Sequence, residues 1–465
     1  MSESVASQGQ GPASNAAETA REEMDLLPDV DVSAGRARAI TELAVRVGEL
    51  ALRSGSSAAR TEALIRRVSQ AFGLPVQLDV TYSRILLSYE PLGAATPITI
   101  MRSVASTQLD YDRLERVENL VTLVRRGELD VETATARLNH LVAAPFTHPR
   151  WFGRLAACLL GATIALLIGG NGTDMAVGAV STLLVDEARQ QLERWSPGSF
   201  FTTAVCAAIP TTLAMLALAV QRWVPSWVPP MDPSLVIAAG MVSLLAGMGT
   251  VAAAGDAIDG SFLGAGARTV EVVVTTGGIV LGLVTTLWLA RAVGVTTQLE
   301  PGASQNPNHL LQLVCSALVA LAFGVRFTMR AKALAITTAL GLLLWASYLA
   351  AGWATGSHPA RVAIAALVVG FVARMLVHWL HTPLVALTST AVAALMPGVM
   401  LYRGVFAITD ENPVDATWLL LGSTYVAIGL AAGTSFGAML AALVLYHRRD
   451  TDPSEPFALV EQAHG

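Results

Sequence analysis

The chain has 465 residues and a formal net charge of −5; 53% of its residues are hydrophobic and 14% are charged. Residues 151–446 carry far fewer charges than a water-soluble domain of that size, which excludes a wholly soluble protein. The acidic balance argues against nucleic acid as a partner. The three cysteines lie far apart in apolar stretches, so we expect small core residues, no metal site and no cofactor.

The beginning of the chain is acidic. The first 34 residues contain seven acidic residues against Arg21 and few side chains to bury, which predicts a disordered tail. No basic segment followed by a short apolar one opens the chain, so we expect no cleavable secretory signal.

In residues 35–146, here called the head, the spacing of the apolar positions changes twice along the sequence. Apolar positions first recur at helical spacing, then alternate, and then return to helical spacing. The pattern predicts a compact cytoplasmic α+β domain in which Asp130 is the N-cap of the last helix. We expect helices over 34–54, 57–72, 112–125 and 131–142 and strands over 76–80, 85–88 and 98–101.

The second helix of the head carries the triplet Arg60, Thr61 and Glu62. Residues two apart on a helix do not face each other, so Arg60 and Glu62 are not an intrahelical pair. The triplet either stabilises the head, contacts the membrane part or binds a regulatory ligand, and we favour the first.

After residue 150 apolar stretches recur at about the 20 residues that a helix needs to cross a bilayer. We expect an α-helical polytopic membrane protein with about ten transmembrane helices. They are predicted near 151–170, 173–191, 199–221, 234–255, 267–291, 309–329, 333–352, 360–377, 383–403 and 415–446.

A polar linker, residues 298–308, divides these stretches into transmembrane halves of five, 147–297 and 309–446, before a cytoplasmic tail at 447–465. An odd number of crossings per half makes the second half inverted relative to the first. Arginine is in excess at the stretch ends that lie on the side of the head. The positive-inside rule then predicts that both termini are cytoplasmic.

Inverted repeats are typical of secondary transporters, whose sites lie where helices of both halves are interrupted. The fourth stretch contains Gly247 and Gly249 and continues to Asp256 and Asp259; the ninth contains Pro397 and Gly398 and continues to Tyr402 and Arg403. We therefore predict a substrate and ion pathway at these two interruptions. Glycine and proline are also frequent in ordinary membrane helices, which is the alternative.

Other motifs are weaker. The pattern Gly433-Thr-Ser-Phe-Gly437 matches a nucleophile elbow but lies in an apolar helix. Together with Gly429 it predicts instead a small-residue ridge for helix association, possible between two copies of the chain. Asp186 belongs either to the pathway or to a solvated helix end. The single lysine, Lys332, has no Walker A context, which argues against an ATP-driven pump.

The head segment Leu52-Arg-Ser-Gly55-Ser-Ser-Ala-Ala-Arg60-Thr61-Glu62 resembles the opening domain of the threonine/serine exporter family. The segment Met396-Pro397-Gly398-Val-Met-Leu-Tyr402-Arg403-Gly404 is similar to that family's second half. The resemblance covers roughly residues 35–446 and implies a fused two-half exporter of threonine and serine. Ala246-Gly247 stands where a Pro-Gly pair would mirror the second half, so the two interruptions differ chemically.

We therefore expect a secondary transporter of the bacterial plasma membrane that moves a small amino acid out of the cytoplasm by alternating access. The proton gradient or the membrane potential would drive it. We expect Asp256 or Asp259 to serve the substrate ammonium or a coupling proton, and Arg403 to serve the carboxylate. A dicarboxylate exporter, an enzymatic head and an amino-acid sensor remain the alternatives.

Overall fold

The structure is a computed structural model. It describes residues 34–449 except 82, 91–95, 105–108, 145–148, 196–197, 222–224, 226–228, 243, 245–246, 259, 293–307, 381 and 410–412. The expected acidic tail, most of the linker, the C-terminal tail and Asp259 therefore lie outside the described residues.

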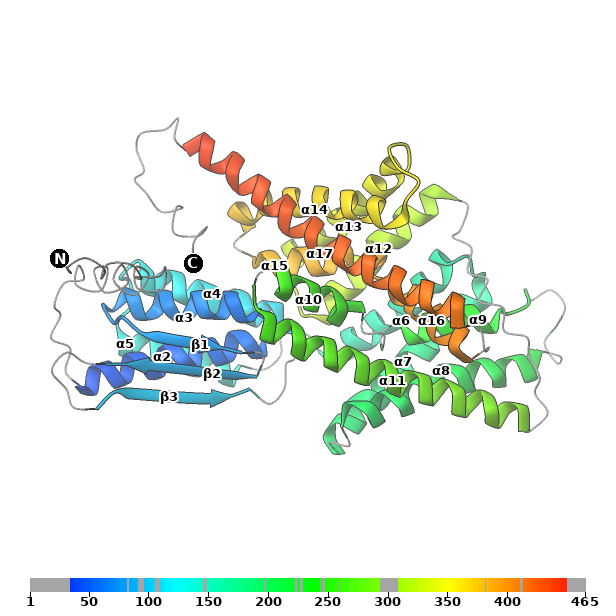
Figure 1. The fold of residues 1–465 in the computed structure, drawn as a ribbon, viewed down its shortest axis with the longest axis horizontal. Coiled ribbons are helices and arrows are strands. Elements are labelled where there is room, and N and C mark those ends of the chain that lie inside the picture. The colour runs from blue at the N-terminus through cyan, green and yellow to red at the C-terminus, as the bar shows by residue number, and fades with distance from the viewer. Residues whose placement is uncertain are drawn as a thin grey trace, which may run out of the picture.

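The head consists of helices on one face of a small sheet at one end of the molecule (Figure 1). Strand β2 pairs antiparallel with both neighbours, so the order is β1-β2-β3. Alternation along β2 buries Ile85 and Leu87 under the helices and turns Leu86 outward. The elements are α2 (Ala34–Arg53), α3 (Ala58–Ala71), β1 (Gln77–Val80), β2 (Arg84–Tyr89), β3 (Ile98–Ser103), α4 (Tyr111–Arg125) and α5 (Val131–Ala143).

Side-chain caps begin three of the head helices. Ser57, Asp110 and Asp130 each accept a hydrogen bond from the backbone N–H three residues later, at the start of α3, α4 and α5. Such a cap satisfies one of the amide groups that the first helical turn leaves without a partner. The prediction for Asp130 is confirmed.

The rest of the chain is helical, and every predicted apolar stretch contains helix. The fourth and ninth stretches are each broken in two. The second break falls at Pro397 as predicted, whereas the first falls between Met241 and Gly247, so that Gly247 and Gly249 lie in the first turn of α10. The elements are α6 (Arg150–Leu167), α7 (Gly172–Trp195), α8 (Ser199–Gln221), α9 (Pro233–Met241), α10 (Gly247–Ile258), α11 (Phe262–Ala292), α12 (His309–Arg326), α13 (Ala331–Ala351), α14 (His358–Leu380), α15 (Leu384–Ala391), η1 (Val392–Leu395), α16 (Gly398–Thr409) and α17 (Pro413–Arg449).

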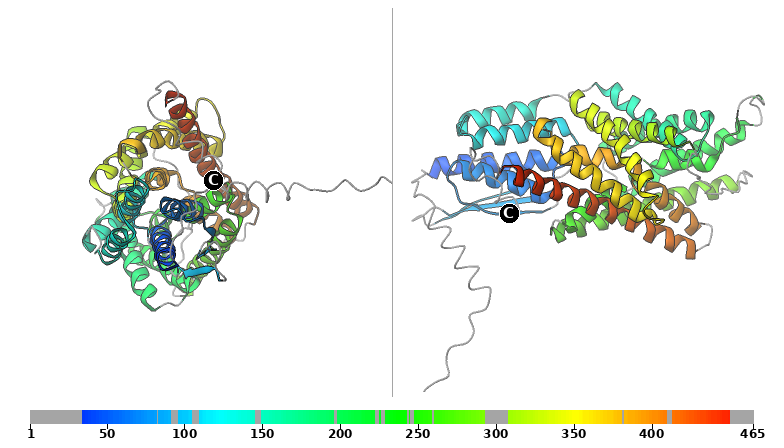
Figure 2. Two further views of the ribbon diagram at one scale, coloured as in Figure 1. Left: turned by 90° about the vertical axis from the view of Figure 1, so that its left-hand side faces the viewer. Right: turned by 90° about the horizontal axis from the view of Figure 1, so that it is seen from above.

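Within the described residues, six helices are long and apolar enough to cross a membrane, and seven if the bent α15–α16 pair counts as one span. Large apolar side chains project outward from these helices, among them Phe201 on α8, Trp288 on α11 and Trp418 on α17. Exposed apolar surface of this kind is expected against lipid tails. The chain thus has the architecture of a polytopic membrane protein, elongated along the axis that joins the head to the helices (Figure 2).

The glycine ridge on α17 has a partner within the chain. A Cβ at Gly433 would lie 2.5 Å from the Ala363 carbonyl oxygen of α14, and one at Gly437 would collide with the Leu367 carbonyl. Gly429 faces α14 as well, at Pro359 and Ala363. The small-residue ridge thus packs against α14 of the same chain, and the association of two copies stays a prediction.

Candidate functional site

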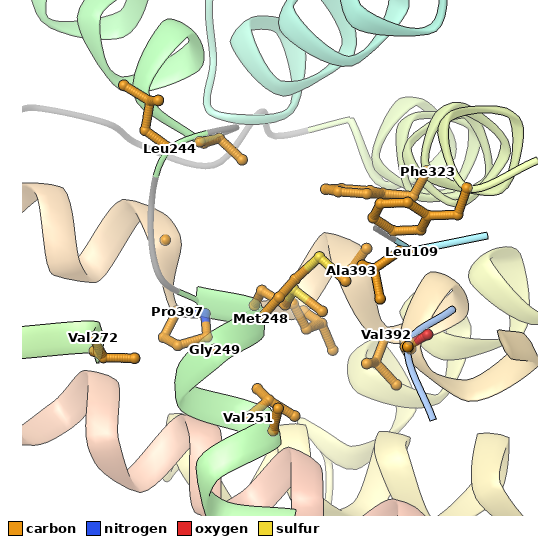
Figure 3. A pocket seen from close by; sticks show the side chains of 18 of the residues that line it. Leu109, Leu244, Met248, Gly249, Val251, Val272, Phe323, Val392, Ala393 and Pro397 are labelled. Atoms are coloured by element: carbon orange, nitrogen blue, oxygen red, sulfur yellow. The ribbon is translucent and has the colours of Figure 1, made fainter. Parts of the chain in front are cut away.

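A cavity of about 1720 Å³ lies between the head and the helices. Both broken segments reach it: Met248 and Gly249 come from α10, and Val392, Ala393 and Pro397 come from η1 and the turn after it (Figure 3). The head contributes Arg60 and Tyr111, among others, to the same wall. The cavity is thus bounded by segments more than 300 residues apart in the sequence.

The second break follows from the covalent structure of proline. Pro397 has no backbone N–H, and Met396 before it is extended, with ψ 143°, as residues before proline prefer. A proline leaves the carbonyl four residues earlier without its helical partner, and here that carbonyl, of Ala393, accepts a hydrogen bond of 3.3 Å from Met396 N. Gly398 then begins α16, and the helix axis bends by 47° between the two arms.

Four carboxylate side chains line the cavity, those of Asp186, Glu193, Asp256 and Glu271. The two aspartates are buried, and each forms an ion pair with an arginine. Asp256 on α10 is 6% exposed and lies 2.7 Å from Arg268 Nε on α11. Asp186 on α7 is 5% exposed and forms an ion pair with Arg326 at the end of α12. Arg268 and Arg326 line the cavity as well, so both signs of charge are presented to it.

Of the remaining predicted site residues, the structure places some in the cavity lining and one outside it. Arg403 and Gly398 line the cavity together with Pro397. Tyr402 is 2% exposed, lies outside the lining and packs near Phe406; its hydroxyl has no hydrogen-bond partner among the described residues. The role of Tyr402 in the pathway stays a prediction; in this structure the helical turn carries its ring away from the side on which Arg403 lies.

The three residues of the head triplet, Arg60, Thr61 and Glu62, each lie in a different environment. Arg60 Nε lies 2.7 Å from Glu118 of α4 and lines the cavity. Thr61 is fully buried in the head, and Glu62 pairs with Arg66 one turn later at 2.8 Å. Two of the three residues thus serve the head itself, and Arg60 also reaches the membrane part.

The first turn of α4 attaches the head to the second half of the chain. Arg330, in the turn between α12 and α13, lies 2.6 Å from Asp112 and 2.7 Å from Glu115. The Thr328 hydroxyl donates to Asp110 at 2.6 Å. These residues were not predicted as a contact, although the sequence carries a signal for it: an acidic first helical turn in the head and a basic connection between two apolar stretches.

Burial at this attachment changes two acid–base equilibria. The pKa of Tyr111 is raised to about 12, because burial disfavours the phenolate more than the hydrogen bond with Ser389 favours it. The pKa of Glu115 is also raised: burial disfavours its charge, and the attraction of Arg330 only partly compensates. Burial at the interface thus makes both Tyr111 and Glu115 harder to ionise than they are in water.

The described residues contain no group of three or more histidine, cysteine, aspartate or glutamate side chains that could hold a metal ion. The chemistry that the cavity offers is ionic and hydrogen-bonding recognition of a small molecule.

Comparison with known proteins gives a consistent result over nearly the whole chain. Residues 42–290 match the family described as "Putative threonine/serine exporter", and residues 312–440 match the one described as "Threonine/Serine exporter, ThrE". A protein of Mycobacterium tuberculosis named "Probable threonine/serine exporter" is 28% identical over 421 residues, which are 88% of this chain and 78% of that protein. The "Threonine/serine exporter" of Corynebacterium glutamicum is 27% identical over 406 residues, 86% of this chain and 80% of that protein.

No solved structure matches the chain. Since the family is one of transporters, an enzymatic activity is not expected of the head. The match of the first family to more than half of the chain, with the second family covering the second set of helices, means that this chain belongs to the threonine/serine exporter family and contains both of its halves.

Proposed function

We propose that this protein exports small neutral amino acids, threonine and serine, from the cytoplasm across the bacterial plasma membrane. The observation that carries the proposal is the cavity, which is bounded by both broken helices and lined by carboxylates and guanidinium groups together. A zwitterionic amino acid needs partners of both signs, and the cavity lining provides carboxylates and guanidinium groups side by side. The names of the relatives agree with this substrate class.

The mechanism that we propose is alternating access between two inverted five-helix halves. Equivalent helices pack together in each half: α6 on α7 as α12 on α13, α8 on α11 as α14 on α17, and α7 on α9 as α13 on α15. The breaks fall at the fourth segment of each half. Both facts support an internal repeat of ten crossings in which the two halves rock about the cavity.

We assign the energy source to the proton gradient or the membrane potential. Asp256, buried beside Arg268, carries the coupling proton in this proposal, and Arg403 contacts the substrate carboxylate farther along the pathway. The head and both termini are cytoplasmic, in accord with the arginine-rich ends on that side.

The experiment is threonine release from cells loaded with a threonine-containing dipeptide, with and without the protein. We expect release that depends on the protein and collapses with an uncoupler at constant cellular ATP. Release that persists under the uncoupler would contradict gradient coupling. Accumulation of the amino acid inside, with no effect of the protein, would contradict export itself.

A further inference from the structure

The ion pair between Asp186 and Arg326 joins the two halves of the membrane part. Asp186 belongs to α7 and Arg326 to the last turn of α12, 140 residues later. Gln190, one turn after Asp186, donates a hydrogen bond of 3.1 Å to its second carboxylate oxygen. All three residues line the cavity.

Two other ion pairs provide the comparison. The Asp256–Arg268 pair also lines the cavity but connects α10 to α11 within one half. The Arg154–Glu187 pair contains the residue next to Asp186, but its side chains are 55% and 40% exposed and it connects α6 to α7. Asp186–Arg326 thus combines burial, access to the cavity and a link between the halves.

Removing one partner of a buried ion pair leaves an uncompensated charge, which is strongly unfavourable. A zwitterion avoids this cost because it brings an ammonium and a carboxylate together. We propose that Asp186 and Arg326 form a substrate-recognition site on the head side of the cavity, in which the α-ammonium binds Asp186 and the α-carboxylate binds Arg326. Gln190 positions the Asp186 carboxylate.

This inference rests on the proposed function and adds a physical cause for the proposed rocking of the two halves. When the substrate replaces the direct ion pair, each charge keeps a partner, but the two helices are no longer joined to each other. Binding then breaks this ionic link between α7 and α12 on the head side, and only a molecule with both charges breaks it without leaving a buried charge unpaired. A free amine lacks the group that satisfies Arg326, and a hydroxy acid lacks the one that satisfies Asp186.

The contacts between the head and the end of α12 show where the proposed site lies relative to the head. The head covers this side of the cavity through Arg60 and Tyr111. The residue after Arg326, Phe327, accepts a backbone hydrogen bond of 3.0 Å from Tyr111 N. The proposed site therefore lies directly under the head, at the entrance that a cytoplasmic substrate would use.

The test compares three ligands on the purified full-length protein in detergent. L-Threonine carries both charges, threoninol lacks the carboxylate, and 3-hydroxybutyrate lacks the ammonium. We expect Asp186→Asn to weaken threonine binding at least tenfold without weakening the binding of 3-hydroxybutyrate, while Arg326→Gln weakens threonine binding without weakening that of threoninol. Glu187→Gln is the matched control and should alter none of the three affinities.

A second measurement needs no variant. Phenylglyoxal modifies arginine side chains, and peptide mass spectrometry reports the extent at Arg326. Threonine should slow modification of Arg326 in the wild-type protein, and threoninol should not. Equal losses of affinity for all three ligands in both variants, or no protection of Arg326 by bound threonine, would overturn the recognition site while leaving the export proposal intact. A wild-type protein that neither binds nor exports threonine would contradict the proposed function instead.

Discussion

The phenolic oxygen of Tyr111, in the first turn of α4, lies 2.8 Å from the Ser389 hydroxyl on α15, 278 residues later in the chain. This hydrogen bond connects the head directly to the arm that precedes the Pro397 break. Tyr111 is 3% exposed and its ring meets Phe327 edge-on, with centroids 5.6 Å apart. The head is therefore in contact with the broken helix as well as with the connection between α12 and α13.

The contribution of this contact can be measured by a double-mutant cycle. We expect Tyr111→Phe and Ser389→Ala each to lower the free energy of unfolding, with a coupling energy of about 1 kcal/mol between them, the usual net value of one hydrogen bond. Thermal or denaturant unfolding in detergent provides the measurement. Tyr89→Phe on β2 is the control for loss of a hydroxyl from another largely buried tyrosine of the head. Additive effects of the first two substitutions would argue against the contact.

Glu115 gives a pH prediction. Its pKa in the folded protein is raised above the usual 4.5, so its contribution to stability is fully present below that value and is lost as the pH rises through the folded pKa. Glu115→Gln removes this loss. The melting temperature of the variant, relative to wild type, should therefore increase between pH 4.5 and pH 7. If the melting temperature of the variant relative to wild type decreased from pH 4.5 to pH 7, the attraction of Arg330 would outweigh burial in setting the pKa of Glu115.

Pro397→Ala tests the second break. The substitution restores a backbone N–H, and a proline in a helix interior costs about 3 kcal/mol or more, so the variant should allow a continuous helix and a stability equal to or above wild type. We expect threonine efflux from vesicles to fall sharply. Pro210→Ala, within α8 and outside the cavity lining, is the matched control and should retain efflux. Wild-type efflux from Pro397→Ala would remove the break from the mechanism.

Asp256→Asn separates binding from coupling. The variant keeps the shape of the side chain but removes the charge beside Arg268, so counterflow exchange of threonine should continue while gradient-driven accumulation fails. Loss of one partner of the pair is also destabilising by about 3–5 kcal/mol. The double variant Asp256→Asn/Arg268→Gln removes both charges, and it should recover the melting temperature without recovering accumulation. Normal accumulation in either variant would show that Asp256 carries no coupling proton.

The proposed orientation is tested by labelling. Single cysteines in the head and after residue 450 should be protected from an impermeant reagent in intact cells, whereas one at residue 304 should react. The background is a variant without the three native cysteines, of which Cys206 and Cys315 are buried. Reaction of the head from outside would reverse the orientation and, with it, the direction of transport.

The sequence by itself determined the features that depend on local composition. Apolar stretches identified every helical segment of residues 150–449, because a helix in lipid satisfies its own backbone groups whatever its neighbours are. Pro397 predicted the second break for a similar reason, since a missing N–H acts on its own segment. Asp130 predicted the start of α5 through its own side chain.

Only the tertiary structure decided which residues meet. Asp186 pairs with Arg326, Asp256 with Arg268 and Arg60 with Glu118, although the sequence offers each carboxylate many arginines. The α17 glycine ridge was visible in the sequence, but its partner, α14, was not. A charge or a small-residue surface fixes what kind of partner it needs, whereas the identity of that partner depends on how helices far apart in the sequence pack, and no local pattern carries that information.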